Sequence, residues 1–269
     1  MKIVRKEHKG ENGRVLVVGG SQDYVGAPAL AAMAALKTGV DIVTVCAPEK
    51  VAWAMNSYTP DLITRKFPGE ELHTSHAREI IDLAERHDVV VLGPGLGLKK
   101  DFVLKLLREI KKPFVIDADA IKVISLTVAS NSVLTPNQRE FELLCANTEK
   151  RPESEKFDTD ASIKTMQKYI GDNVVLLKGP TDTIFTKHLR HVNKTGHNSM
   201  TIGGTGDILA GLTAGFIAQT GRLFESAVQA SFVNGKAGEY MYKQMGYGYT
   251  SYDMVKELWR FTRHGLFQG

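Results

Sequence analysis

Cysteine is scarce in this chain, and two kinds of long segment are missing from it. Cys46 and Cys145 are its two cysteines, far apart and outside any CxxC spacing, which argues against a disulfide framework and a zinc site. We expect both thiols to be buried as small apolar groups. No stretch is long and apolar enough for a membrane span, and the opening MKIVRKEHKG lacks the apolar core of a signal peptide. These absences predict a reduced, cytoplasmic protein with no membrane partner.

A strong charge of either sign is also missing. The formal net charge is +4, which suits anionic small molecules but is too small to indicate a nucleic-acid partner. No basic run with interleaved aromatic residues, the pattern of single-strand binders, occurs in the chain. We therefore expect no nucleic-acid partner.

What the chain does have is an ordinary globular composition over 269 residues, with 43% apolar and 24% charged residues. That length suits one large α/β domain or two small ones. No Ser/Gly-rich linker and no internal repeat divides the sequence. We therefore predict one domain over residues 1–269.

Short β-branched runs alternate with longer amphipathic stretches. The pattern predicts strands at 15–18, 42–45, 89–92, 114–117, 133–134, 174–177 and 183–186. It predicts helices at 28–37, 79–86, 102–110, 208–217 and 226–241. Near-continuous apolar strands that alternate with helices indicate an α/β fold, a three-layer α/β/α arrangement around a mostly parallel sheet.

Four turns rich in glycine or acid follow predicted strands: GGS, GPGLG, DAD and TPNQRE. Ligands of such sheets bind beyond the carboxyl ends of the strands, so the turns predict a cleft at one sheet edge. Within DAD, solvation of the strand end or helix capping is favoured for Asp117 and Asp119 over a ligand role.

The stretch TIGGTGDILAG at 201–211 combines glycines with one acid at the start of a predicted helix. Gly203, Gly204 and Gly206 can adopt positive φ, so successive N–H groups can form an anion-binding nest at the helix N-terminus. Asp207 would then accept a proton from an attacking hydroxyl, or it would simply cap the helix. The loop is neither a P-loop nor a dinucleotide fingerprint, because GxxxxGK[ST] is absent and GTGDIL lacks the third glycine.

GGTGD at the start of a helix resembles the anion hole and catalytic base of the ribokinase-like superfamily. Within it, the whole chain resembles the ADP/ATP-dependent NAD(P)H-hydrate dehydratases. The matching stretches are HKGENG (8–13), VLVVGGSQDYVGAPALAAMAALKTGVDIVTV (15–45), GPGLG (93–97), VIDADAI (115–121), LTPNQREF (134–141), VLLKGPTDTI (175–184), GGTGDILAG (203–211) and TSYDMV (250–255). GGTGD is shared with many kinases of the fold, whereas HKGxxG with GGSxxYxGAPxLAA is specific to the dehydratases.

The resemblance implies a repair reaction. Hydrated NADH or NADPH would be phosphorylated on its ring hydroxyl by ADP or ATP, and phosphate would leave as the ring double bond is restored, giving AMP and phosphate from ADP. The family's ADP preference outside eukaryotes favours ADP, and Mg²⁺ would offset phosphate charge. The resemblance also implies a homo-oligomer, such as a tetramer, and an ordered loop over the cleft at His8 and Lys9.

The same resemblance assigns the site residues. It makes Asp207, Gly204, Thr205 and Gly206 catalytic, it gives Lys178, Gly179, Thr181 and Gly206 to the nucleotide, and it gives Ala27, Gly95, Asn137 and Asp207 to the hydrated substrate. From the residues alone, Lys178 at a strand end would be a solvated lysine. His197, beside the glycine turn, is favoured as a structural residue over a ligand contact. The late aromatic residues Tyr247, Tyr249, Tyr252 and Trp259 are expected in the core or at subunit contacts.

Two departures from the family pattern weaken the substrate assignment. The family usually has TPHxGE, but here Asn137 replaces the histidine and Arg139 the glycine. TPNQRE matches instead the N-x-x-E pattern of vitamin and sugar kinases, which implies an indirect role for Glu140 near Mg²⁺ and phosphate. The family often has GNPGM where this chain has GHNSM at 196–200.

Two other functions therefore stay open. One is a kinase for a small alcohol, such as a vitamin precursor or a sugar, which Asn137 and Glu140 favour and HKGxxG opposes. The other is a non-catalytic nucleotide-binding or sensing protein. The intact GGTGD argues against the second, because a pure binder gains nothing from an acid beside phosphate.

Overall fold

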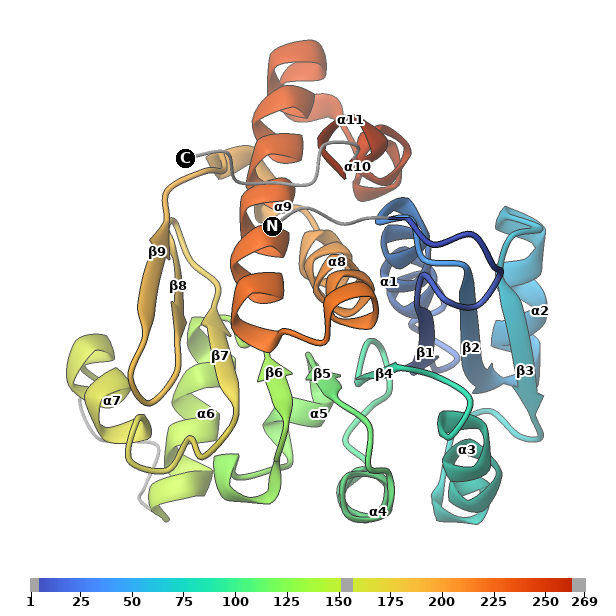
Figure 1. The fold of residues 1–269 in the computed structure, drawn as a ribbon, viewed down its shortest axis with the longest axis horizontal. Coiled ribbons are helices and arrows are strands. Elements are labelled where there is room, and N and C mark those ends of the chain that lie inside the picture. The colour runs from blue at the N-terminus through green and yellow to red at the C-terminus, as the bar shows by residue number, and fades with distance from the viewer. Residues whose placement is uncertain (1–4, 151–156, 263–269) are drawn as a thin grey trace.

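A nine-stranded sheet runs through the computed structural model, which describes residues 5–150 and 157–262, and helices cover both faces of the sheet (Figure 1). The strands are Arg14–Val18 (β1), Ile42–Pro48 (β2), Ile63–Phe67 (β3), Val89–Leu92 (β4), Phe114–Ile116 (β5), Ser132–Leu134 (β6), Val174–Leu177 (β7), Asp182–Phe185 (β8) and Arg190–Asn193 (β9). The α-helices are Gly26–Lys37 (α1), Glu49–Tyr58 (α2), Ala77–Ala84 (α3), Lys100–Glu109 (α4), Asp119–Lys122 (α5), Gln138–Glu149 (α6), Thr159–Met166 (α7), Thr205–Thr220 (α8), Leu223–Met245 (α9), Ser251–Glu257 (α10) and Trp259–Thr262 (α11). Short 3₁₀ helices span Thr74–His76 (η1), Leu126–Val128 (η2), Asn198–Thr201 (η3) and Gly246–Gly248 (η4).

The strand order is β3-β2-β1-β4-β5-β6-β7-β8-β9. Strands β1 to β7 run parallel, and the β8–β9 hairpin adds two antiparallel strands at one edge. The predicted three-layer α/β/α fold with a mostly parallel sheet is therefore confirmed. The carboxyl ends of β1, β4, β5 and β6 are neighbours, so the turns that follow them share one rim.

Alternate residues of each central strand pack into two separate cores. Val15 and Val17 of β1 lie in the core under α1, α2, α8, α9 and α10, while Leu16 and Val18 lie in the core under α3, α4, α5, α6 and α7. All four side chains are fully buried. A strand buried on both faces needs apolar residues at every position, which is why the strands read as continuous apolar runs.

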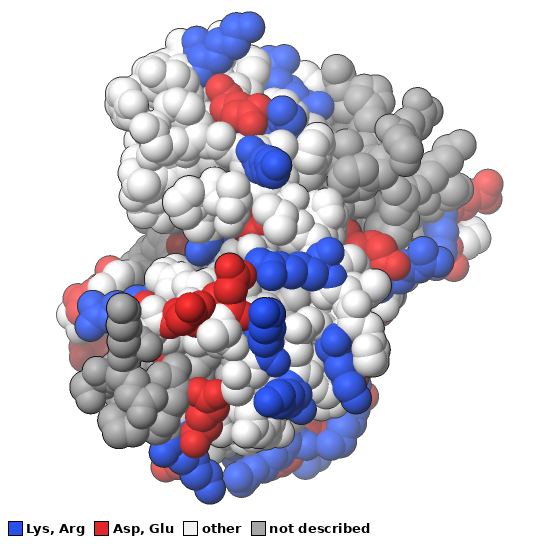
Figure 2. All heavy atoms as spheres, turned by 90° about the vertical axis from the view of Figure 1, so that its left-hand side faces the viewer, with Lys and Arg blue, Asp and Glu red and all other residues white. Residues whose placement is uncertain are grey.

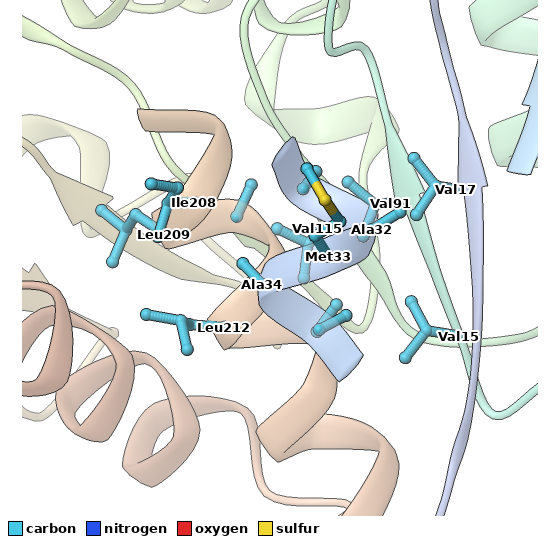
Figure 3. Close-up of a cluster of buried hydrophobic side chains, with 14 of the residues drawn as sticks. Val15, Val17, Ala32, Met33, Ala34, Val91, Val115, Ile208, Leu209 and Leu212 are labelled. Carbon is cyan, nitrogen blue, oxygen red and sulfur yellow. The ribbon is translucent and has the colours of Figure 1, made fainter. Parts of the chain in front are cut away.

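Helices α1 and α8 pack backbone against backbone. A Cβ on Gly211 would lie 2.0 Å from the carbonyl oxygen of Ala31, and a Cβ on Gly215 would lie 2.2 Å from Oγ1 of Thr38. Figure 3 shows the two helices side by side, with valines of β1, β4 and β5 completing the cluster. The small residues of the helix predicted at 28–37 thus serve an internal contact between helices.

The prediction for the two cysteines and the prediction for the loop at residues 8–13 have different outcomes. Cys46 and Cys145 are both buried, as expected. The loop HKGENG is ordered, but its predicted place over the cleft is wrong. Asp41, just before β2, accepts hydrogen bonds from the N–H groups of Gly10 (2.7 Å) and Asn12 (3.1 Å), which fixes the loop at the amino ends of the strands. Among the described residues, no helix has the length and apolar character of a membrane span.

Candidate active site

The turns after the central strands form one continuous rim. The N–H of Gly20 donates to the carbonyl of Pro94 at 2.9 Å, which joins the turns that follow β1 and β4. The N–H of Lys178 donates to the carbonyl of Pro136 at 2.8 Å, which joins the turns that follow β6 and β7. The cleft predicted at the carboxyl edge of the sheet therefore has a rigid backbone floor.

The glycine turn opens helix α8 without a side-chain cap. Gly204 is the N-cap, with φ +97°, and a Cβ there would lie 2.5 Å from Cδ1 of Leu30 and 2.9 Å from Cβ of Ser251. Only glycine fits this position, for both reasons. The predicted positive φ is not found at Gly203 or Gly206. The first N–H groups of α8 keep their capacity to bind an anion, because no side chain accepts from them.

Asp207 lies in the first turn of α8, three residues beyond the N-cap, so the capping explanation for this residue is wrong. Burial raises the pKa of Asp207 to about 7, and the negative charge of Asp117 adds to the rise, while the ammonium of Lys178 opposes it. A carboxyl group whose pKa is near 7 is suited to general-base catalysis at neutral pH.

Lys178 lies among carboxylates rather than in solvent, so the prediction of a solvated lysine is wrong. Its Nζ is 3.0 Å from Oδ1 of Asp117 and 3.8 Å from Oε2 of Glu140. It is also 3.2 Å from where a Cβ of Gly206 would be, which places the ammonium at the start of α8. Burial would lower the pKa of Lys178, but Asp117 and Glu140 outweigh that effect and raise it, so the side chain stays charged.

Asp117 is buried, with 1% of its surface exposed, so strand-end solvation does not describe it. Its Oδ1 accepts a hydrogen bond from Oγ1 of Thr135 at 2.7 Å in addition to the Lys178 contact. The next residue, Ala118, has φ +49°, a strained value for a side chain with a Cβ. This backbone turn lets Asp119 point away from Asp117, toward the N–H of Gly97 at 2.8 Å.

Asn137 and Glu140 form a reciprocal capping box at the start of α6. Oδ1 of Asn137 accepts from the N–H of Glu140 at 2.9 Å, and Oε2 of Glu140 accepts from the N–H of Asn137 at 2.9 Å. The N-x-x-E pattern thus has a structural use here. Burial raises the pKa of Glu140, and Lys178 opposes the rise.

Ala27 and Gly95, the two predicted substrate contacts outside the glycine turn, lie next to each other. A Cβ on Gly95 would be 3.4 Å from Cβ of Ala27 and 2.6 Å from Cβ of Tyr24. Leu30, one turn further along α1, contacts Gly204. The substrate end of the predicted site therefore adjoins the glycine turn through the first two turns of α1.

A cavity of about 620 Å³ opens beside the glycine turn. Its walls come from the β7–β8 turn, the loop that leads into α8 and the middle of α9. They include Asn137, Lys178, Gly179, Asp182, Thr195, Gly196, His197, Asn198, Met200, Thr205, Gly206, Asn234 and Gly235. Thr181, predicted to bind the nucleotide, is exposed in the same turn but is not part of these walls. Figure 2 shows the face of the molecule on the β8–β9 side, where acidic and basic side chains lie side by side around an indented middle.

Sequence reasoning missed the residues that shape the β7–β8 turn. Oδ1 of Asp182 accepts from the N–H of Gly179 at 3.1 Å, and its Oδ2 accepts from Oγ of Ser231 at 2.6 Å. Asn193 of β9 donates to the same Ser231 at 2.7 Å. An acid four residues after Lys178 was the available signal, but Ser231 is joined to it only by the tertiary fold.

The carboxylates near Lys178 do not form a preassembled metal centre. In residues 5–150 and 157–262, no three His, Cys, Asp or Glu side chains are placed to hold a metal ion. Mg²⁺ that enters with a nucleotide needs fewer than three protein ligands. It keeps several waters and binds through the phosphates and one or two carboxylates. Glu140, at the edge of the Lys178 cluster, fits such an indirect role.

Comparison with known proteins identifies the family of the chain. Residues 15–260 match the model of a family described as NAD(P)H-hydrate dehydratase. A bifunctional NAD(P)H-hydrate repair enzyme of Pyrobaculum aerophilum is 41% identical over 266 residues, 97% of this chain and 52% of the relative. An ADP-dependent (S)-NAD(P)H-hydrate dehydratase of Nitrosopumilus maritimus is 35% identical over 260 residues, 94% of this chain and 89% of that protein. The chain thus spans about half the length of the first relative and most of the second.

A solved structure has the same fold. An ADP/ATP-dependent NAD(P)H-hydrate dehydratase from Bacillus subtilis, co-crystallised with ATP and Mg²⁺, has a TM-score of 0.78 and 23% identity. The likeness covers 96% of this chain and 94% of the other. At 23% identity the match shows a shared fold, and it does so over nearly the whole chain.

Proposed function

The chain belongs to the NAD(P)H-hydrate dehydratase family, and from this premise we propose that it converts hydrated NADH and NADPH back to the reduced cofactors at the expense of a nucleotide. The observation that carries the proposal is Asp207, a carboxylate with a pKa of about 7, beside the uncapped N-terminus of α8. A general base and an anion-binding backbone are then next to each other, as phosphoryl transfer to a hydroxyl requires.

In the proposed reaction, Asp207 removes the proton of the ring hydroxyl as that oxygen attacks the terminal phosphorus of the donor. The bond from that phosphorus to the bridging oxygen breaks, and the donor leaves with one phosphate fewer. The N–H groups of Gly204, Thr205 and Gly206 stabilise the charge on the transferring phosphoryl group. The ring carbon–oxygen bond then breaks, phosphate leaves and the neighbouring carbon loses a proton, which restores the double bond.

Lys178 serves the nucleotide in this proposal. Its ammonium lies at the start of α8 and is held there by Asp117. The lysine side chain forms part of the cavity wall. The exposed backbone of Gly179 continues the same wall, and Thr181 stands at its outer edge. The hydrated substrate would lie at the other end, over Ala27 and Gly95, with Asn137 beside the cavity.

We propose ADP as the donor, since a relative that aligns over 89% of its own length is named ADP-dependent. The co-crystal of the Bacillus subtilis protein keeps ATP as the alternative to test. Mg²⁺ would enter with the phosphates and reach Glu140 through water, and its charge would offset that of the nucleotide. We also propose that residues 1–269 form one ribokinase-like domain that acts in the cytoplasm as a homo-oligomer, such as a tetramer.

One observation favours a second function, a kinase for a small alcohol. Asn137 replaces a residue that can titrate near neutrality with one that cannot, and its Oδ1 is already engaged by the helix cap. A site whose substrate contact is reduced in this way has less to distinguish a nicotinamide hydrate from another alcohol.

The deciding experiment supplies hydrated NADH and Mg²⁺ with ADP or ATP and follows the absorbance of the reduced nicotinamide. We expect a rise that requires the nucleotide and is lost in Asp207→Asn. Folding of the variant is checked by circular dichroism. If folded wild-type protein gives no rise with either donor, the dehydratase proposal is wrong, and a screen of small alcohols for nucleotide-dependent phosphorylation tests the kinase.

A further inference from the structure

The loop that leads into α8 is contacted along its length by one later segment of the chain. We call residues 197–204 the pre-α8 loop and residues 242–251, from the end of α9 to the start of α10, the tyrosine segment. Members of the pre-α8 loop line the cavity, whereas none of the three tyrosines of the tyrosine segment does. Any effect of these tyrosines on a ligand must therefore pass through the loop.

The first contact is a ring stack. The His197 and Tyr242 rings are 3.7 Å apart between centroids and inclined by 21°. Nδ1 of His197 accepts from the N–H of Ser199 at 3.2 Å, so the ring is fixed by a hydrogen bond as well as by the stack. His197 is thus held in place at the wall of the cavity.

The second contact is buried. The hydroxyl groups of Tyr249 and Ser199 are 3.0 Å apart, and each residue is only 3% exposed. Oγ of Ser199 is also 3.1 Å from Nδ1 of His197, which joins the two contacts into one chain of hydrogen bonds. Between them, Asn198 accepts a longer bond of 3.4 Å from the hydroxyl of Tyr247.

The third contact is at the far end of the loop. Oγ of Ser251 donates to the carbonyl of Gly203, and its Cβ packs beside Gly204. Ser251 is the first residue of α10, whose N-cap Thr250 forms a capping box with Asp253: the N–H of Thr250 donates to Oδ2 of Asp253 at 3.1 Å, and Oγ1 of Thr250 accepts from the N–H of Asp253 at 3.2 Å. The carbonyl that precedes the N-cap of α8 is therefore tied to another helix.

We propose that Tyr249, together with Tyr242, is a positioning residue that holds the pre-α8 loop in the shape that receives the phosphates of the nucleotide. This inference rests on the proposed function, because it takes the occupant of the cavity to be a nucleoside diphosphate or triphosphate. The loop reaches Gly204, so its shape determines where the first N–H groups of α8 point. A loop fixed beforehand loses less conformational entropy when an anion binds.

The sequence gives a physical reason for this arrangement. The chain has GHNSM where the family often has GNPGM, so it lacks a proline, which would fix φ without any partner. Asn198 stands where the proline would be and Ser199 where the second glycine would be, and the hydroxyl groups of Tyr247 and Tyr249 contact these two residues. Side-chain hydrogen bonds thus take over the restraint that a proline would give.

The test is a double-mutant cycle between Tyr249 and Ser199. Tyr249→Phe keeps the buried ring and removes only its hydroxyl, and Ser199→Ala removes the partner. Calorimetric titration with ADP and with ATP in the presence of Mg²⁺ measures affinity, and thermal unfolding measures stability. We expect each single variant to bind nucleotide roughly five- to tenfold more weakly, the loss of about one hydrogen bond, and the double variant to be no weaker than either.

Tyr252→Phe is the matched control, because this tyrosine is next to the same segment, exposed, and in contact with Lys256 rather than with the loop. It should bind like the wild type. Tyr242→Leu, which removes the stack from a half-buried position, should weaken binding as Tyr249→Phe does. Each variant is also assayed for kcat and for KM of the nucleotide, and KM should rise while the unfolding temperature falls by only the few degrees that one lost buried hydrogen bond costs.

Two outcomes would overturn this inference while leaving the proposed function intact. One is an unchanged nucleotide affinity with a lowered unfolding temperature, and the other is losses of binding free energy that simply add in the double variant. Wild-type protein that binds neither ADP nor ATP would instead contradict the proposed function. Because affinity is read without the acceptor, a kinase acting on another alcohol would leave the expected result in place.

Discussion

Lys178 and Asp117 are 61 residues apart in the chain, yet Nζ of the first lies 3.0 Å from Oδ1 of the second. The carboxylate is buried and also holds the hydroxyl of Thr135, so the pair is fixed on both sides. The lysine is thereby aimed at the start of α8, where Gly206 leaves room for it. A charged pair this deep is costly to disrupt on one side only.

Lys178→Met should therefore have two effects. It leaves Asp117 buried without its counter-ion, which should lower the free energy of unfolding by roughly 3 kcal/mol, and it removes the cation proposed for the nucleotide. Urea unfolding and calorimetric titration with ADP measure the two effects. In the double variant Lys178→Met/Asp117→Asn, stability should largely return while nucleotide binding stays weak. Recovery of both would show that Lys178 acts only through the fold.

Asp207→Asn should abolish turnover but make the protein more stable at pH 8. The pKa of Asp207 is raised in the folded state, so folding favours its protonated form and the charged form above pH 7 destabilises the protein. An amide carries no such penalty, and we expect a gain of roughly 2 kcal/mol at pH 8 that declines between pH 7 and pH 4. Thermal unfolding across that range measures it. A variant less stable than the wild type at pH 8 would contradict the conclusion that ionised Asp207 destabilises the folded protein at that pH.

The pH profile of the free enzyme should report the same group. If Asp207 must be ionised to act, kcat/KM rises with pH and reaches half its limit near pH 7. Asp117→Asn removes a negative neighbour and frees the charge of Lys178, and both changes lower the pKa of Asp207. The midpoint should move to lower pH. Asp61→Asn, an exposed residue outside the site, is the control, and equal midpoints in both variants would argue against coupling between Asp117 and Asp207.

Gly211→Ala tests the contact between α1 and α8. The added methyl would lie 2.0 Å from the carbonyl oxygen of Ala31, so the helices must move apart, which should cost roughly 1–3 kcal/mol of unfolding free energy. Gly26→Ala is the control, because a Cβ there has no neighbour within 4 Å. Chemical denaturation of both variants checks the difference. Equal stability would mean that α1 and α8 separate more easily than their backbone contact indicates.

The strands that were predicted are mainly those whose sequence is dictated by burial on both faces of the sheet. The strands that cross the middle of the sheet, such as β1 and β4, read as apolar runs because each face meets a layer of helices. Strand β3 was missed because it is an edge strand with Ile63 exposed and basic residues in between. Strand β9 was missed for a similar reason, since its sequence RHVN is largely polar.

The candidate site shows the same division. The glycine turn and its acid were readable because a local backbone requirement, at Gly204, leaves a local signature. The partners of Lys178 were not readable, because Asp117 follows β5, Glu140 lies in the first turn of α6, and only the sheet order brings them together. Tyr249 was expected in the core and is buried, but its hydroxyl partner Ser199 carries no sequence signal. Tyr247, Tyr252 and Trp259 are largely exposed, so the core half of that expectation is wrong for them.

The close packing of α1 against α8 bears on the rate at which two bound ligands can react. Each of these helices begins at a loop of the cleft, one beside Gly95 and the other at Gly204, and at Gly211 no side chain separates their backbones. Two ligands bound by those loops would be held at a distance set by main-chain atoms, which move less than side chains do. Their alignment would be supplied by the scaffold before either arrives, so less entropy would be lost on reaching the transition state, without a closing motion of one lobe on another.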